Sequence, residues 1–244
     1  MPSLRSFIFR AFIKVLSLRI NSMASVSGLR TFSEKISRWQ RLPAGSITER
    51  QTLDGVQVEW IRPPGPVPKT VILYLHGGAW VLGWYHTHRV LAAYIGRASR
   101  SRVAAVDYRL APEHPFPAAL DDCLAVYRCL INDGINPERI VIAGDSVGAN
   151  LTLAVMLTLR AADEPLPAAA VCISPMTDLA FTGEHFYTRK DALLTAEFVR
   201  SMAIHYVGGQ DVYNPLISPL YGDLKGLPPL LVHAGKDEIL LGDA

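Results

Sequence analysis

The sequence predicts an α/β protein with a mainly parallel β-sheet that is covered by helices on both faces. From residue 70 onward, short apolar runs typical of buried strands alternate with longer stretches of helical pattern. Two of these runs lead into glycine-rich turns. In a parallel sheet such turns meet at the carboxyl ends of the strands, so we expect the active residues at that edge.

The order of the elements follows from apolar runs and from turn signals. Strands at 47–53 and 56–62 flank Asp54-Gly55, a pair typical of a type I′ turn, and so predict an antiparallel hairpin. A proline-rich stretch at 63–68 then leads into the apolar run that begins at Thr70. The later strands are expected at 70–75, 102–106, 139–143, 169–173 and 229–233, with helices near 86–98, 117–132, 147–161 and 194–206.

The composition indicates one compact globular domain. The 244 residues are 50% hydrophobic and 19% charged, with a net charge of +2, which allows a large core and gives no sign of a disordered tract. No basic stripe with interleaved aromatic residues suggests a nucleic-acid partner. Three cysteines have no metal-ligand spacing and are interpreted as reduced, buried thiols, which favours a cytoplasmic location: Cys123, Cys129 and Cys172.

The first 33 residues differ from the rest, since they carry five basic residues and no acidic one. Charges at every fourth or fifth position interrupt any apolar run of the ~20 residues that a membrane span requires. Three interpretations stay open. They are contact of residues 1–22 with a membrane surface, a helix that packs onto the domain as part of a cap, and a translation start at Met23.

A serine between two glycines stands where an expected strand meets an expected helix. The run Gly144-Asp145-Ser146-Val147-Gly148 follows the strand 139–143 and opens the helix 147–161. This is the layout of a nucleophile elbow, in which flanking glycines let backbone segments pass closely and the serine hydroxyl projects from the strand tip. Ser146 is therefore the candidate nucleophile, and its neighbour Asp145 is interpreted as structural.

A second glycine motif, His76-Gly77-Gly78-Ala79-Trp80, follows the strand 70–75. Adjacent glycines at a strand end can turn their N–H groups toward one point, and acyl transfer needs such donors where negative charge develops on the carbonyl oxygen. His76 is interpreted as a residue that supports this loop and not as a catalytic base. The candidate oxyanion hole comprises the N–H groups of Gly77, Gly78, Ala79 and Val147.

Together these motifs resemble the hormone-sensitive-lipase-like esterases, the family IV carboxylesterases of the α/β-hydrolase fold. The motif at 107–120 contains a candidate charge cluster of Asp107, Arg109 and Glu113. One departure is Ala79, where the family usually has a third glycine. The matching stretches are GDSVGAN at 144–150, HGGAW at 76–80, DYRLAPEHPFPAAL at 107–120, SPMTDL at 174–179 and GLPPLLVHAGKDEILLGDA at 226–244.

The resemblance implies an α/β-hydrolase core at 46–244 with a helical cap insertion at about 180–226, preceded by a cap or targeting segment at 1–45. It implies a carboxylesterase or lipase-type serine hydrolase, a class of enzyme used in lipid metabolism. The reaction would proceed through an acyl-enzyme on short or medium acyl esters or lactones. No metal and no organic cofactor are implied, and the partner is a small-molecule ester.

In this fold the catalytic triad follows the order serine, acid, histidine, and the acid that matches the family is Asp237. All seven histidines precede Asp237, so no general base is assigned. His233, at the end of the strand before the acid, is a candidate substitute, but we interpret it as a histidine packed at a strand end. Without the base the serine hydroxyl stays protonated, and we expect this chain to be nearly inactive.

Two explanations of the missing base stay open. In the first, the chain is truncated, the family's last helix and strand are missing, and the strand 229–233 becomes an exposed edge that favours oligomers. In the second, the chain is a noncatalytic, receptor-like homologue that binds a small molecule and has lost the histidine. Truncation is the preferred interpretation, since a receptor would keep the elements that complete its fold.

Overall fold

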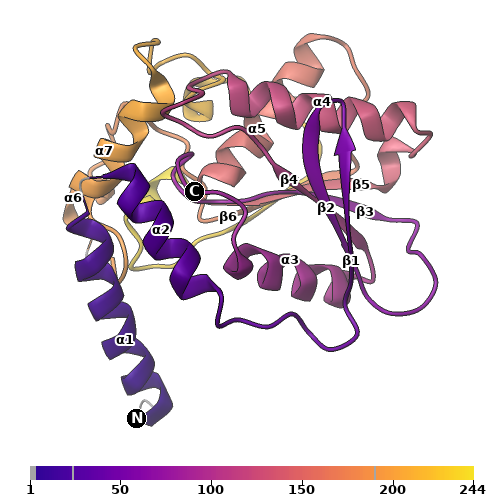
Figure 1. Ribbon diagram of the computed structural model, residues 1–244. Coiled ribbons are helices and arrows are strands. Elements are labelled where there is room, and N and C mark those ends of the chain that lie inside the picture. The colour runs from indigo at the N-terminus through magenta and orange to yellow at the C-terminus, as the bar shows by residue number, and fades with distance from the viewer. Residues whose placement is uncertain (1–3, 24, 190) are drawn as a thin grey trace.

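The computed structural model describes residues 4–23, 25–189 and 191–244. Its centre is a seven-stranded sheet with the strand order β1-β2-β4-β3-β5-β6-β7 (Figure 1). Every expected strand is present, with bounds within two residues of those predicted. The strands are β1 (Ile47–Leu53), β2 (Val56–Arg62), β3 (Val71–Leu75), β4 (Arg102–Asp107), β5 (Ile140–Asp145), β6 (Ala169–Ile173) and β7 (Leu230–His233).

The pairing confirms a mainly parallel sheet. β1 and β2 form the expected antiparallel hairpin, and β2 also pairs antiparallel with β4. From β4 through β3, β5 and β6 to β7 every pairing is parallel. All residues of β3 are buried, and alternate side chains serve opposite faces, because Leu73 and Leu75 join one core cluster whereas Ile72 and Tyr74 join the other.

Helices cover both faces of this sheet (Figure 1). α3 (His86–Ser99) packs on β2 and β4 on one face, and α4 (Ala118–Asn132) and α5 (Val147–Ala161) lie on the other. These three helices and α7 (Ala196–Val207) confirm the four that the sequence predicts. The structure adds α1 (Leu4–Asn21), α2 (Val26–Ser37), the short α6 (His185–Thr188) and three 3₁₀ helices, η1 (Pro137–Arg139), η2 (Pro219–Tyr221) and η3 (Ile239–Asp243).

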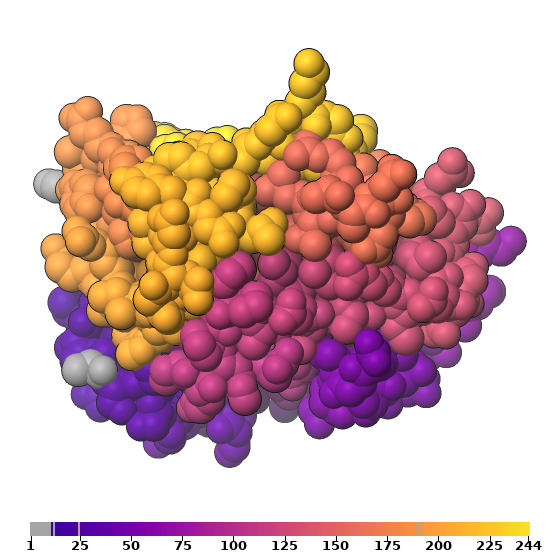
Figure 2. Space-filling model, turned by 90° about the horizontal axis from the view of Figure 1, so that it is seen from above, coloured from indigo at the N-terminus to yellow at the C-terminus, as the bar shows by residue number. Residues whose placement is uncertain are grey.

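The N-terminal helices lie beside the segment around α6 and α7, at one end of the molecule (Figures 1 and 2). Asn21, the last residue of α1, donates to the carbonyl of Leu193 at 2.8 Å and accepts from the N–H of Thr195 at 3.0 Å. Leu29 of α2 is fully buried in the core. These contacts support the interpretation that the N-terminal segment packs onto the domain. None of the described helices has the length and apolar character needed to cross a membrane.

The three cysteines are free thiols. Cys123 in α4 and Cys172 in β6 are buried as expected, and burial raises the pKa of both thiols, that of Cys172 to about 12. Cys129 is only partly buried, because it lies in the last turn of α4, close to solvent. The expectation of three buried thiols is therefore correct for two of them.

β7 carries exposed apolar side chains at the edge of the sheet. Leu230, Leu231 and Val232 have exposed fractions of 37%, 53% and 40%. In the described part of the chain, β7 is paired only with β6. Unpaired backbone groups beside apolar side chains favour association between strands, which is the basis of the expectation of oligomers.

η3 is hydrogen-bonded to the loop that follows β6. The Oδ2 atom of Asp243 accepts hydrogen bonds from the N–H groups of Thr177 at 2.7 Å and Asp178 at 2.9 Å. The hydroxyl of Thr177 also donates to the carbonyl of Asp243 at 2.8 Å. Burial raises the pKa of the Asp243 carboxyl to about 6, although the two N–H donors act in the opposite direction.

We predict that Asp243→Asn changes how stability depends on pH. A carboxyl whose pKa is higher in the folded than in the unfolded state takes up protons on folding, so the free energy of unfolding falls as the pH rises through its titration and is level above it. For Asp243 this interval runs from the ordinary value of 3.8 to about 6. The amide does not titrate. As the pH rises through this interval, the free energy of unfolding of the variant should therefore increase by about 1 to 3 kcal/mol relative to that of the parent.

Urea unfolding at intervals between pH 4 and pH 7 measures this difference. A difference between variant and parent that stays constant across the interval would contradict the raised pKa of Asp243.

Candidate active site

Ser146 lies in the tight turn between β5 and α5, in a backbone conformation that serine rarely adopts. Its φ and ψ angles are 54° and −118°. The turn is held on both sides, because the N–H of Ser146 donates to the carbonyl of Ile173 at 2.8 Å and its carbonyl accepts from the N–H of Ala149 at 3.1 Å. A residue with a side chain is strained in this region by about 1 to 3 kcal/mol.

The two glycines of the elbow are required by close backbone contacts. A β-carbon at Gly148 would overlap the carbonyl oxygen of Leu75, the last residue of β3. A β-carbon at Gly144 would overlap the carbonyl of Gly148. The glycine-x-serine-x-glycine spacing therefore lets α5 begin directly against the end of β3, where the second glycine motif starts.

The loop after β3 passes through three consecutive residues with positive φ. The angles are 121° at Gly78, 54° at Ala79 and 58° at Trp80. The carbonyl of Gly78 accepts from the N–H groups of Val81 at 3.1 Å and Leu82 at 2.8 Å, which closes the loop into a tight turn. Ala79 thus carries a methyl group in a conformation that favours glycine.

Asp145 links this loop to the elbow. Its Oδ1 atom accepts hydrogen bonds from the N–H of Gly77 at 3.0 Å and from the hydroxyl of Tyr74 at 2.6 Å. The N–H of Gly77 is therefore engaged, and the set of free donors is smaller than the four predicted. Among the described residues no acceptor is present for the N–H groups of the other three predicted donors, Gly78, Ala79 and Val147.

His76 is fully buried behind the same loop. Its ring stacks on Tyr108 with centroids 4.2 Å apart, and the Tyr108 hydroxyl donates to the His76 carbonyl at 2.6 Å. Its Nδ1 lies 2.7 Å from the carbonyl oxygen of Gly77. Burial lowers the pKa of His76 to about 3, so the ring is neutral near pH 7. These contacts support a role in holding the loop.

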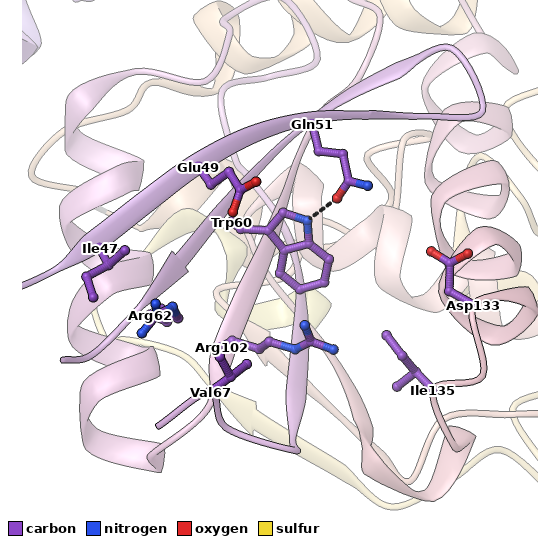
Figure 3. A pocket seen from close by; sticks show the side chains of 9 residues that line it. All are labelled: Ile47, Glu49, Gln51, Trp60, Arg62, Val67, Arg102, Asp133 and Ile135. Carbon is purple, nitrogen blue, oxygen red and sulfur yellow. Dashed lines mark hydrogen bonds between the residues drawn. The ribbon is translucent and has the colours of Figure 1, made fainter. Parts of the chain in front are cut away.

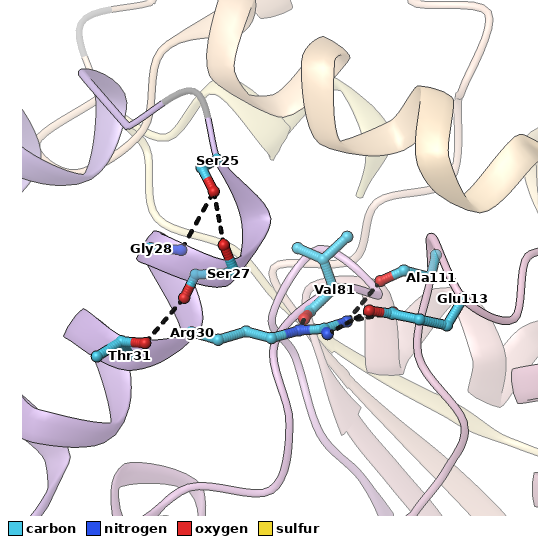
Figure 4. A network of polar contacts seen from close by, with 8 residues as sticks. All are labelled: Ser25, Ser27, Gly28, Arg30, Thr31, Val81, Ala111 and Glu113. Carbon is cyan, nitrogen blue, oxygen red and sulfur yellow. Dashed lines mark hydrogen bonds and ion pairs between the residues drawn. The ribbon is translucent and has the colours of Figure 1, made fainter.

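An arginine of α2 fastens the outer side of the loop, a contact that the sequence analysis missed (Figure 4). Arg30 donates from Nε to the carbonyl of Val81 at 2.7 Å and from Nη2 to that of Ala111 at 2.8 Å. Both of its terminal nitrogens pair with Glu113 at 2.8 Å. The N–H of Ala111 in turn donates to the carbonyl of Trp80 at 2.9 Å. Hydrogen bonding to Arg30 lowers the pKa of Glu113 to about 2.

The candidate charge cluster of Asp107, Arg109 and Glu113 does not form. Arg109 pairs with Asp122 of α4, from Nη2 at 2.8 Å, and Glu113 pairs with Arg30. Arg109 and Glu113 thus each pair with a residue of a nearby helix, and Asp107 forms no ion pair with a described residue. Closeness in the sequence was misleading because the side chains of Arg109 and Glu113 point to different helices.

Asp237 lies at the edge of the sheet that carries Ser146. Asp145 pairs with Ile173 and Ile173 with His233, so the carboxyl ends of β5, β6 and β7 are side by side. Asp237 follows four residues after β7, and its exposed side chain borders a hollow of about 1090 Å³ between α1 and the loops at 191–193 and 235–238. No described residue forms a hydrogen bond or ion pair with its carboxylate.

The histidines do not complete a triad within the part of the chain that the structure describes. All seven precede Asp237, and none of their rings is hydrogen-bonded to Ser146 or Asp237. The interpretation of His233 as packed is wrong, because β7 is an edge strand and His233 is exposed. Among the described residues, no three histidine, cysteine, aspartate or glutamate side chains are grouped to hold a metal ion.

Comparison with known proteins places the chain among esterases. A family model described as the alpha/beta hydrolase fold matches residues 72–244. An acetyl-hydrolase of Streptomyces hygroscopicus is 46% identical over 205 residues, which cover 83% of this chain and 67% of that protein. An esterase of Acinetobacter venetianus is 42% identical over 196 residues, which cover 79% of this chain and 64% of that protein. The chain thus spans about two thirds of the length of these relatives.

Solved structures agree with this result. An esterase from the bacterial hormone-sensitive lipase family has a TM-score of 0.91 and 43% identity, covering 96% of this chain and 80% of its own. The esterase EstE5 has a TM-score of 0.93 and 38% identity, covering 99% of this chain and 82% of its own. The resemblance inferred from the sequence motifs is confirmed, and the chain belongs to the α/β-hydrolase family, among the esterases of the hormone-sensitive lipase family.

Proposed function

We propose that this protein hydrolyses carboxylic esters through an acyl-enzyme formed at Ser146. The observation that carries the proposal is the strained turn at Ser146, with a φ of 54°, beside a loop whose N–H groups have no acceptor among the described residues. A protein that only binds a ligand has no need of a strained serine, whereas acyl transfer needs a projecting hydroxyl and nearby donors.

The chemistry follows from these groups. The Ser146 oxygen attacks the ester carbonyl carbon while its proton passes to a base, and the N–H groups of Gly78, Ala79 and Val147 donate to the oxyanion. The bond to the alkoxy group breaks, and the alcohol leaves with the proton. Water then attacks the acyl carbon, which releases the carboxylic acid and restores the serine. Asp237 is the candidate partner that orients the base.

The general base is the member of the triad that these 244 residues do not supply after Asp237. A serine hydroxyl without an adjacent base is a weak nucleophile near pH 7. We therefore propose that the 244-residue chain by itself hydrolyses esters only slightly faster than the uncatalysed reaction in water. The small acceleration would come from its oxyanion donors and from substrate binding.

The proposed substrates are short or medium acyl esters or lactones. The hollow beside Asp237 is bordered by Ile13, Leu18 and Leu193 together with charged residues, and Ser146 is not among the residues that line it, so it does not define the acyl group. The methyl group of Ala79 adds bulk to the loop at residues 76–82, called the oxyanion loop, and favours a small acyl group. The relative from Streptomyces hygroscopicus is itself an acetyl-hydrolase.

A noncatalytic binding homologue is the second candidate function. The observation that favours it is that no histidine ring of the described residues is hydrogen-bonded to Ser146 or Asp237. The two candidates differ in how ester hydrolysis responds to an added general base. A base creates an efficient esterase only if the nucleophile and the oxyanion donors are already in place.

Hydrolysis of p-nitrophenyl butyrate separates them. We predict that the parent chain stays within about tenfold of its Ser146→Ala variant. Joining to Ala244 the segment of the Acinetobacter venetianus relative that begins after the position matching Ala244, and that contains a histidine, should raise kcat/KM by about 100- to 1,000-fold, because it adds a base to the proposed nucleophile and oxyanion hole.

Ser146→Ala in the joined protein is the matched control and should remove the gain. A folded joined protein that contains the added histidine and shows no gain would contradict the esterase proposal and favour the binding homologue.

Arg30 is proposed as a positioning residue for the oxyanion loop. In the joined protein, Arg30→Met should lower kcat about 3- to 30-fold and change KM less than threefold, because oxyanion donors act chiefly on the transition state. Arg30→Lys should retain part of the activity. Arg128→Met is the control, because it removes an exposed ion pair with Glu164 that is remote from the loop, and it should change kcat less than twofold. Equal losses of kcat in the two methionine variants would exclude the positioning role.

A further inference from the structure

A basic hollow lies at the end of the sheet opposite to Ser146. It consists of two adjoining cavities of about 420 Å³ and 580 Å³ that share Val67, Arg102, Asp133 and Ile135. Arg102 opens β4, and the register places Arg102 and Ile140 beside Val71, so the amino ends of β3, β4 and β5 form one border. A strand of the length of β5 separates this border from Ser146 by about 20 Å.

Four cations border the hollow. Arg62 lines the first cavity, Lys69 and Arg139 line the second, and Arg102 lines both. Within the described residues, no carboxylate lies within 4.0 Å of any of these four groups, whereas five other arginines form ion pairs elsewhere on the molecule. Among the described residues, the guanidinium of Arg62 donates only to the carbonyl of Gly65, at 3.1 Å. The hollow therefore gathers four cations that form no ion pair with a described residue, and the two carboxylates on its border, Glu49 and Asp133, offset their charge only in part.

The side chain of Arg102 is held in place at the centre of the hollow. Its guanidinium lies over the indole of Trp60, 4.6 Å from the ring centroid. The indole is fixed in turn, since its N–H donates to Oε1 of Gln51 at 2.9 Å (Figure 3). The Nε of Arg102 is buried, and no described residue accepts a hydrogen bond from it. An acceptor that reached this donor would satisfy a buried polar group that has no partner among the described residues.

We propose that the basic hollow binds a small molecule with two or more phosphate or carboxylate groups. Arginine matches both groups, because its planar fork donates two parallel hydrogen bonds. Each cavity has the size of a small-molecule site. The two carboxylates that border it, Glu49 and Asp133, would repel a broad anionic surface such as a membrane or a nucleic acid and leave room for a compact anion. The site is independent of ester hydrolysis.

Calorimetric titration of the 244-residue protein with inorganic pyrophosphate and, separately, with citrate tests the proposal. Saturable binding of one equivalent of either anion is expected, and which anion binds tells phosphate from carboxylate recognition. Arg102→Gln should weaken binding at least tenfold. Arg97→Gln, an equal loss of charge at an exposed position of α3, should change it less than twofold.

Asp133→Asn gives a second test that does not disturb the stacked arginine. Removing this carboxylate should tighten binding about two- to fivefold, whereas Asp223→Asn, an exposed carboxylate outside the hollow, should leave it unchanged. The proposal is overturned if neither anion binds saturably, if Arg97→Gln weakens binding as much as Arg102→Gln does, or if the two asparagine variants behave alike.

Discussion

Gly148 has no side chain, and its α-carbon lies so close to the end of β3 that a β-carbon would overlap the carbonyl oxygen of Leu75. This contact brings the first turn of α5 directly against the strand from which the oxyanion loop departs. The proposed nucleophile and the proposed oxyanion donors therefore belong to one rigid unit, although they lie about seventy residues apart in the chain. Rigid placement matters because donors must be in position before charge develops on the substrate.

Other contacts hold the same unit from different sides. The carboxylate of Asp145 in the elbow accepts hydrogen bonds from Gly77 and Tyr74, and His76 is buried behind the loop. From outside, Arg30 connects α2 to the carbonyl of Val81. These contacts involve buried or partly buried groups with several hydrogen bonds each, which is why the loop can hold Ala79 and Trp80 at positive φ.

The strands and the elbow could be predicted because their signals are local. Runs of β-branched and apolar residues mark each strand of a buried parallel sheet, and the glycines around Ser146 mark the turn. The ion pair of Arg30 with Glu113 could not be predicted, because its partners lie 83 residues apart and meet only when α2 packs on the domain. The hydrogen bond from the Gly77 N–H depends on the direction of the Asp145 side chain. The basic hollow depends on the alignment of the amino ends of β3, β4 and β5. The spacing of residues in the sequence indicates neither feature.

The free energy of unfolding of Gly148→Ala, measured by urea denaturation, tests the central contact most directly. The account predicts a loss of at least about 3 kcal/mol, since the methyl group would meet backbone atoms that cannot move without shifting β3. Gly28→Ala in α2 is the matched control, because its β-carbon would make only ordinary contacts, 3.8 Å from Ser25 at the nearest, and should change stability by less than about 1 kcal/mol. A Gly148→Ala protein that unfolds within about 1 kcal/mol of the parent would contradict the account.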